Sequence, residues 1–317
     1  MTSPNKTIGV FDSGFGGLTV LRALLPLIPD ARYIYLGDTA RLPYGSKSHE
    51  TIARYAVSSA KFLHEQGAEL LVIACNTATA LALEDIQQAL PIPVIGVVEP
   101  GARAALSLCS KNSQCHPERS AAESKDLRFA AAARTSAAPT SATPASATSD
   151  LSPIDNHVLV LATAATVQSH AYTRALNSLG LEAYEKACPL LVPLVEEGWI
   201  DHPVTNDVLK IYLTEALTAA PATQTLLLGC THYPLIEPAI RRTLADLGHS
   251  LDLIDSAKAT AHAVAAHLGL DVHDTKLNSH SPQCVFYATD SIRKFQQLGS
   301  SFLGEPVADV NLVDLGG

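Results

Sequence analysis

Two cysteines, Cys75 and Cys230, occupy closely similar positions 155 residues apart in the chain. Each follows a short apolar run, Leu70–Ala74 or Leu226–Gly229, that is typical of a buried strand in a parallel sheet. Ligands bind at the carboxyl ends of such strands, where a helix N-terminus can lower the pKa of a thiol. Two thiols that face one small cavity could each add or remove a proton on opposite faces of one carbon atom.

A cysteine at the end of a strand also has a simpler interpretation, because free cysteine is among the most buried residue types and is usually inert. The repetition favours chemistry instead. Each cysteine is followed at once by hydrogen-bonding residues, Asn76 and Thr77 in one case and Thr231 and His232 in the other. We therefore treat the two thiols as candidate acid–base groups.

The length and composition of the chain limit its function class. Its 317 residues suffice for about two domains of ordinary size, and 47% of them are hydrophobic. A net charge of −9 argues against general binding to nucleic acid or to an anionic membrane. The chain has no run of 18 apolar residues and no segment that resembles a secretory signal. Six cysteines without a CxxC pair predict neither a disulfide framework nor a metal site, so we expect free thiols and a cytoplasmic location.

Strands and helices alternate along the chain, which predicts an α/β fold with parallel sheets covered on both faces. The expected strands are residues 8–11, 33–36, 70–74, 94–98, 157–162, 226–229 and 251–254. The expected helices are residues 18–28, 50–66, 78–89, 167–179, 204–219 and 237–247. Each half has an early strand and loop and a later strand that ends in cysteine. The pattern predicts two similar α/β domains, residues 1–98 with 253–317 and residues 99–252, with the active site in the cleft between them.

Residues 110–156 interrupt this alternation. The tract from Ala130 to Ser149 contains only Ala, Ser, Thr and Pro, apart from Arg134. Such a tract lacks the apolar bulk to form a core, so we expect a disordered insertion in the second domain that acts as a passive spacer. Cys109 and Cys115 at its edge are expected to do no chemistry.

A glycine-rich loop with Gly14, Gly16 and Gly17 follows the first expected strand. Its spacing is neither G-x-G-x-x-G nor that of a P-loop, so it does not predict a nucleotide site. Open backbone amides before a helix can nevertheless hold a carboxylate. Asp12 and Ser13, at the tip of the same strand, are expected to face the cleft, although Asp12 can equally be an ordinary helix cap.

Several motifs occur along the chain in a fixed order. They are Phe11–Leu18, Gly37–Arg41 with Pro43–Gly45, Ala74–Ala78, Val98–Gly101, Val192–Glu196 and Gly229–Pro234. Together they resemble the glutamate racemases, a branch of the cofactor-independent aspartate/glutamate racemase superfamily, over nearly the whole chain outside the insertion. Aspartate racemases share the two cysteines, but the Asp-Ser-Gly loop and the Cys-Thr-His-Tyr-Pro block resemble the glutamate branch.

The resemblance implies an isomerase that racemises glutamate without pyridoxal phosphate or a metal ion. One thiol would remove the α-proton from one enantiomer while the other thiol reprotonates the opposite face. The product D-glutamate would supply peptidoglycan biosynthesis, and the family suggests a homodimer. A racemase for aspartate or another acidic amino acid stays open as an alternative, as does a non-catalytic binding protein on the same fold.

The resemblance also implies roles for individual residues. Asp12 would assist Cys75, and His232 would assist Cys230. Two further carboxylates, Asp38 and Glu196, would be supporting charges, and the substrate contacts would be Asp12, Ser13, Tyr44, Gly45, Asn76, Thr77, Thr231 and His232. Each supporting carboxylate can instead be an ordinary loop cap or ion pair.

One position departs from the family pattern. The loop after the first strand of the second domain usually begins with Gly-Thr, whereas this chain has Ala162 and Thr163. Alanine lacks the easy access of glycine to positive φ, so we expect a slightly shifted loop with activity retained.

Overall fold

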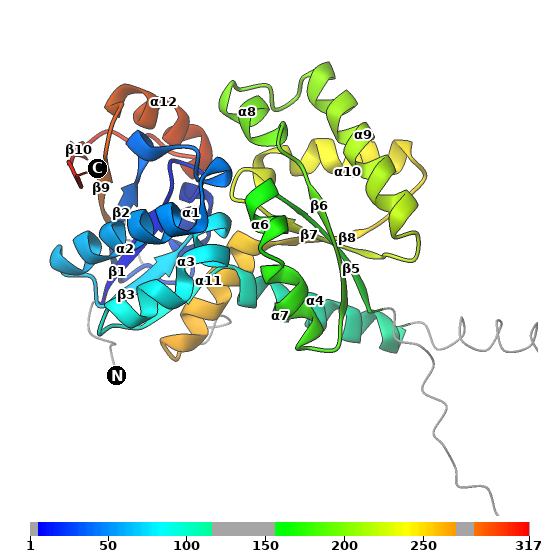
Figure 1. Cartoon of the computed structure of the whole chain (residues 1–317), viewed down its shortest axis with the longest axis horizontal. Helices are drawn as coiled ribbons and strands as arrows, with labels where there is room; N and C mark the ends of the chain where they lie inside the picture. The colour runs from blue at the N-terminus through cyan, green and yellow to red at the C-terminus, as the bar shows by residue number, and fades with distance from the viewer. Residues whose placement is uncertain (1–5, 116–155, 271–281, 317) are drawn as a thin grey trace, which may run out of the picture.

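The computed structural model describes residues 6–115, 156–270 and 282–316. It contains two lobes that lie side by side, each built around a parallel β-sheet (Figure 1). The expected α/β class and pair of parallel sheets are therefore confirmed. The insertion was expected from residue 110, but helix α4 (Val98–Cys115) continues through that point. Most of the expected insertion, residues 116–155, lies outside the described residues, so its disorder stays a prediction.

The sheet of the first lobe has the strand order β10-β9-β2-β1-β3-β4. Its strands are β1 (Thr7–Asp12), β2 (Arg32–Gly37), β3 (Leu70–Ile73), β4 (Val94–Gly96), β9 (Gln283–Ala288) and β10 (Val310–Leu312). Strands β1 and β3 are central and buried on both faces, which explains their continuous apolar runs. Their register places Phe11 opposite Ile73. Asp12 and Cys75 therefore lie at the same carboxyl edge of the sheet.

Helices cover both faces of this sheet, as the alternation predicted. Those on one face are α2 (His49–Glu65) and α3 (Asn76–Ala89), and those on the other are α1 (Leu18–Leu24), α11 (Ser256–His267) and α12 (Ile292–Leu303). Short 3₁₀ turns at Thr39–Arg41 and Tyr44–Ser46 follow β2. Because α11 and α12 come from the end of the chain, the first lobe contains both terminal parts of the sequence (Figure 1).

The sheet of the second lobe has the strand order β6-β5-β7-β8. Its strands are β5 (His157–Ala162), β6 (Glu182–Ala187), β7 (Thr225–Gly229) and β8 (Asp252–Asp255). Helices α4 and α7 (Ala171–Asn177) pack on one face, and α9 (Pro203–Ala219) and α10 (Glu237–Asp246) pack on the other. The short helices α6 (Ala164–Gln168) and α8 (Leu191–Glu196) and the 3₁₀ turn Tyr233–Ile236 follow strand ends. Ala162 pairs with Gly229, which brings Thr163 and Cys230 to one edge.

The boundary between the lobes follows from strand β8. The sequence placed the return to the first domain at residue 253, but β8 pairs with β7 through Leu228 and Asp255. We propose that the second domain extends through Asp255 and that α11 begins the return to the first.

Some elements differ from those expected. The predicted helix over residues 167–179 is broken, because His170 adopts a left-handed φ of 53° between α6 and α7. Strand β6 was not predicted, since the polar residues Glu182, Glu185 and Lys186 interrupt any apolar run at this edge of the sheet. Helices α4, α8, α11 and α12 and strands β9 and β10 were also not predicted. None of the helices in the described ranges is long and apolar enough to cross a membrane.

Candidate active site

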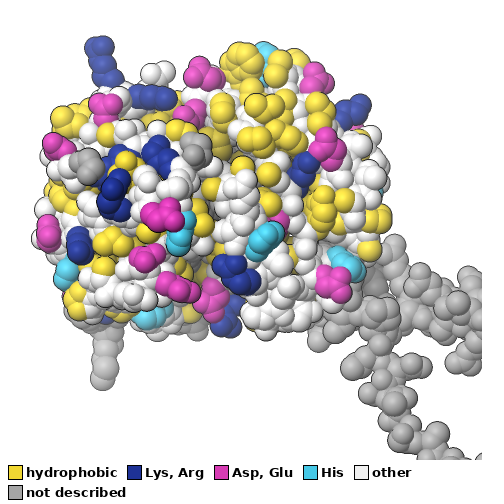
Figure 2. Space-filling model, viewed as in Figure 1, with side chains coloured by type: hydrophobic (Ala, Val, Ile, Leu, Met, Phe, Trp, Pro, Cys, Tyr) yellow, Lys and Arg dark blue, Asp and Glu magenta, His cyan; other side chains and the backbone are white. Residues whose placement is uncertain are grey.

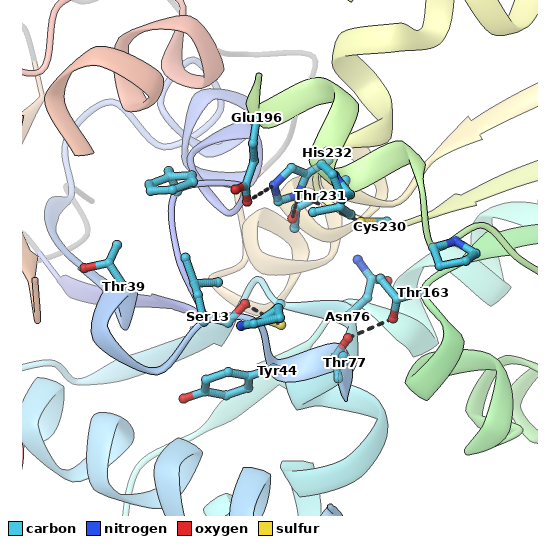
Figure 3. Close-up of a pocket in the computed structure, with 18 of the residues that line it drawn as sticks. Ser13, Thr39, Tyr44, Asn76, Thr77, Thr163, Glu196, Cys230, Thr231 and His232 are labelled. Atoms are coloured by element: carbon cyan, nitrogen blue, oxygen red, sulfur yellow. Dashed lines mark hydrogen bonds and ion pairs between the residues drawn. The ribbon is translucent and has the colours of Figure 1, made fainter. Parts of the chain in front are cut away.

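A cavity of about 520 Å³ lies between the lobes, at the carboxyl edges of both sheets (Figure 3). Ten of the predicted site residues line it: Ser13, Tyr44, Gly45, Cys75, Asn76, Thr77, Glu196, Cys230, Thr231 and His232. Two predicted residues, Asp12 and Asp38, are buried behind this lining. The two thiols therefore reach the same cavity from different sheets.

Cys75 stands at the N-terminus of α3, where the Ala78 N–H donates to its sulfur at 3.4 Å. The thiol donates to Ser13 Oγ, also at 3.4 Å. Burial and, next, the negative charge of Asp12 raise the pKa of Cys75 to about 12, although the bonds to Ser13 and Ala78 act in the opposite sense. The N-terminus of α3 does act to lower this pKa, as expected, but desolvation outweighs it and the net shift of the pKa is upward.

Asp12 is a buried carboxyl group at the tip of β1. Its Oδ2 accepts the Gly14 N–H at 2.9 Å, and its Oδ1 has no hydrogen-bond partner among the described residues. Burial raises the pKa of Asp12, whereas the positive charge of His232 opposes this rise. A carboxyl group with one unpaired oxygen and a raised pKa is suited to exchange a proton.

Cys230 follows β7 and has its own partner, His232. The His232 Nδ1 atom lies 3.9 Å from Cys230 Sγ, and Nε2 forms a hydrogen bond of 3.2 Å with Glu196 Oε1 (Figure 3). The imidazole and the ring of Phe302 pack edge to face, with centroids 5.0 Å apart. These contacts hold the imidazole beside the sulfur.

The electrostatics of this second group differ from those around Cys75. Burial alone would lower the pKa of His232, but hydrogen bonds to Cys230 and Glu196 and their negative charge raise it to about 10. Burial alone would raise the pKa of Glu196, but the bond to His232 and the charges of His232 and Lys294 bring it below its usual range. His232 is therefore cationic at neutral pH, with Glu196 as its counterion.

The lobes touch closely beside Cys230. A Cβ atom at Gly16, in the first lobe, would lie only 2.6 Å from His232 Cε1 in the second. The Thr19 hydroxyl donates to the Thr231 carbonyl at 3.0 Å, again across the lobes. The glycine-rich loop therefore serves as a docking surface for the Cys-Thr-His segment.

The floor of the cavity contains polar groups from both lobes. The Tyr172 hydroxyl donates to Asn76 Oδ1 at 2.6 Å, which leaves the buried Asn76 Nδ2 without a partner among the described residues. The Thr77 and Thr163 hydroxyls lie 3.0 Å apart (Figure 3). Each of them also contacts the Thr166 hydroxyl. Uncharged donors of this kind suit the carboxylates of a small substrate.

Asp38 acts behind Tyr44 rather than in the cavity. Its Oδ2 accepts the Tyr44 hydroxyl at 2.6 Å and lies 3.4 Å from Arg41, while its Oδ1 accepts the Thr289 hydroxyl at 2.9 Å. The ring of Tyr44 lines the cavity, but its hydroxyl is occupied elsewhere. The geometry thus makes Asp38 a support for Tyr44.

Several residues of the lining were not predicted as site residues from the sequence, including Phe15, Thr39, Val192, Pro193, Ser291 and Lys294. Most lie in unpredicted elements or loops. Ala162 has no positive φ and ends strand β5, so alanine causes no strain there. No cluster of three or more His, Cys, Asp or Glu side chains in the described ranges could hold a metal ion.

Comparison with known proteins gives the family. The profile described as Asp/Glu/Hydantoin racemase matches residues 18–113 and 127–264. The chain belongs to this family. It is 45% identical, over the full length of both chains, to the glutamate racemase of Koribacter versatilis (strain Ellin345).

Solved structures agree with this placement. The glutamate racemase of Francisella tularensis, crystallised with D-glutamate, superposes with a TM-score of 0.75 at 32% identity, and 98% of each chain is covered. The Thermus thermophilus glutamate racemase, in complex with β-chloro-D-alanine, gives 0.71 at 37% identity, with 99% of each chain covered. The resemblance that the motifs indicated is therefore confirmed.

Proposed function

We propose that this protein is a glutamate racemase that interconverts L-glutamate and D-glutamate by proton transfer at the α-carbon. One observation carries the proposal: Cys75 and Cys230 enter the same cavity from different sheets, each with a separate acid–base partner. A two-base racemase needs this arrangement, because one group must take a proton while another supplies one from the opposite side.

The reaction needs no oxidant or reductant, because one proton is removed from the α-carbon and another is added. The thiolate of one cysteine forms an S–H bond with the α-proton, and the electron pair of the broken C–H bond stays on the substrate carbon and its carboxylate. The thiol of the other cysteine then gives its proton to the opposite face of that carbon. The two sulfurs finish with exchanged protonation states. Asp12 beside Cys75 and His232 beside Cys230 are placed to return them to the starting state.

Glutamate fits the polar groups of the cavity. Asn76 offers an unpaired amide nitrogen, and Ser13, Thr77 and Thr231 offer hydroxyls. The relatives that match over the full chain are glutamate racemases, and one of them was crystallised with D-glutamate. We therefore favour glutamate over aspartate as the substrate, with no pyridoxal phosphate or metal ion in the reaction.

We further propose that the product serves peptidoglycan biosynthesis in the cytoplasm.

We also propose that the protein is a homodimer. Exposed apolar side chains gather over α8 and α9 (Figure 2), namely Leu190, Trp199, Val204 and Ile211. Such a patch suits a protein interface. Size-exclusion chromatography with light scattering tests the dimer, and a monomer at micromolar concentration would contradict it.

The activity is tested by following the racemisation of glutamate by the purified protein with circular dichroism. L-glutamate and D-glutamate should each approach the racemic mixture, before and after dialysis against a chelator and without added cofactor. L-aspartate should react far more slowly. Preferential turnover of aspartate would move the assignment to the sister activity, and no turnover of either would contradict the proposal.

A further inference from the structure

Lys294, on α12 of the first lobe, reaches into the cavity near residues of the second lobe. Among the described residues that line the cavity, it is the only Lys or Arg. We infer that Lys294 is a positioning residue for the reaction, which holds Glu196 against His232 and so supports proton transfer at Cys230. The inference rests on the proposed racemase function and deepens it.

The contacts form a continuous chain across the cleft. Lys294 Nζ lies 3.7 Å from Glu196 Oε2, whereas the other oxygen of the same carboxylate, Oε1, bonds His232 Nε2 at 3.2 Å. The second nitrogen of that imidazole lies 3.9 Å from Cys230 Sγ. The two oxygens of Glu196 are thus divided between a cation of the first lobe and the acid–base group of the second.

Helix α12 is well anchored to present this lysine. Its next residue, Phe295, is fully buried, and Phe302 on the same helix packs against the His232 ring. The ammonium group itself lies 5.5 Å from the centroid of the buried Phe15 ring. One helix of the first lobe therefore contacts both members of the His232–Glu196 pair.

The expected effect is moderate. The Lys294 side chain is 52% exposed and Glu196 is 17% exposed, so solvent screens their attraction. Without the lysine, Glu196 keeps only one of its two charged partners, His232, and its carboxylate is less firmly oriented. The described lining of the cavity would also present carboxylates and no Lys or Arg to an anionic substrate. We expect kcat/KM to fall about three- to fivefold in a Lys294→Gln variant, the size of a partly exposed ion pair.

A racemase offers a readout that a merely structural residue would not move. Enantiomers have equal free energy, so kcat/KM must fall equally in both directions whichever proton transfer is slowed. The α-deuterium isotope effect is different, because it reports how far the first C–H cleavage limits the rate. Slower transfer at Cys230 should raise the isotope effect for the enantiomer that Cys230 deprotonates and reduce it for the enantiomer that Cys75 deprotonates.

The experiment compares the parent with Lys294→Gln, Lys294→Arg and the control Arg293→Gln. Arg293 is the exposed neighbour on the same helix, so its variant loses an equal charge. Each protein is assayed with α-protiated and α-deuterated L- and D-glutamate. The kcat/KM of Lys294→Gln should fall about three- to fivefold, and its isotope effects for the two enantiomers should change in opposite directions. Its melting temperature should stay unchanged. Lys294→Arg should restore the parent values, and Arg293→Gln should match the parent.

Two results would overturn the inference while the proposed function stands. One is a Lys294→Gln variant with the same kcat/KM and isotope effects as a parent that racemises glutamate. The other is a Lys294→Gln variant in which the isotope effects for the two enantiomers change in the same direction. A parent protein that does not racemise glutamate would instead refute the proposed function, and the role of Lys294 would fall with it.

Discussion

Replacing Gly16 with alanine would place a methyl group between the two lobes at the acid–base pair of Cys230. A Cβ atom there would lie 2.3 Å from Thr231 Oγ1 and 2.6 Å from His232 Cε1, whereas ordinary contact begins at 3.4 Å. The threonine hydroxyl can rotate away. The imidazole cannot move as freely, because Glu196 bonds one edge of it and Phe302 packs against it.

The cost follows from this geometry. His232 or the loop must move by somewhat less than 1 Å to restore ordinary contact with Cε1. A displacement of about 1 Å at a catalytic group can lower the rate by about 100-fold. Overpacking of this kind also destabilises by about 1–3 kcal/mol. We therefore expect Gly16→Ala to fold with a lowered melting temperature and to lose about two orders of magnitude in kcat/KM.

Circular dichroism kinetics and thermal unfolding test this prediction, with Gly14→Ala as the control. A Cβ atom at Gly14 would meet only the flexible tip of Leu42, at 3.1 Å, so its effect should be a few-fold. A Gly16→Ala variant with kcat/KM within twofold of the parent would contradict this prediction, because catalysis at Cys230 would then not depend on this close approach of the lobes.

Three further substitutions test separate parts of the site. Glu196→Gln should bring the pKa of His232 down from about 10. The cationic ring contributes stability that is complete below the unfolded pKa of about 6.5 and is lost as the pH rises through the folded pKa. In the variant, melting curves should therefore show this stability being lost at a lower pH than in the parent. Unchanged melting curves would contradict the ion pair. Tyr44→Phe should destabilise by about 1–3 kcal/mol in urea unfolding with little change in KM, because the lost hydroxyl bonds the buried Asp38. A large rise in KM without loss of stability would place that hydroxyl on the substrate. Thr163→Val keeps the side-chain shape but loses a hydroxyl of the cavity floor, so KM should rise up to about tenfold. The melting temperature should also fall, because the same hydroxyl caps α6 and its loss destabilises by about 0.5–2 kcal/mol. An unchanged KM would remove this threonine from substrate binding.

The positions of the two thiols could be predicted from local patterns. Cys230 directly follows β7 and Cys75 follows β3 after one residue, and both strands are short, buried and parallel and form continuous apolar runs in the sequence. Because parallel strands end at one edge of a sheet, the residues after them had to lie near the cavity. The same reasoning placed Asn76, Thr77, Thr231 and His232 beside the thiols.

The partners of these residues could not be predicted in the same way. Lys294 and Phe302 contact residues far away in sequence only because α12 packs beside the second lobe, and no local period encodes that packing. Tyr172 likewise reaches Asn76 across the lobes. The raised pKa of Cys75 depends on how completely folding removes water from the thiol, which neighbouring residue types do not specify.

In the proposed mechanism, Cys75 and Cys230 each transfer one proton on one face of the α-carbon. Its most direct test follows L- and D-glutamate separately in D2O, with the parent, Cys75→Ser and Cys230→Ser, by proton NMR and circular dichroism at early times. We expect the product enantiomer to gain deuterium while the recovered substrate keeps its α-hydrogen, and we expect each serine variant to lose most of the racemisation activity. Retention of the original hydrogen in the product, or near-parental racemisation by either variant, would contradict the two-thiol mechanism.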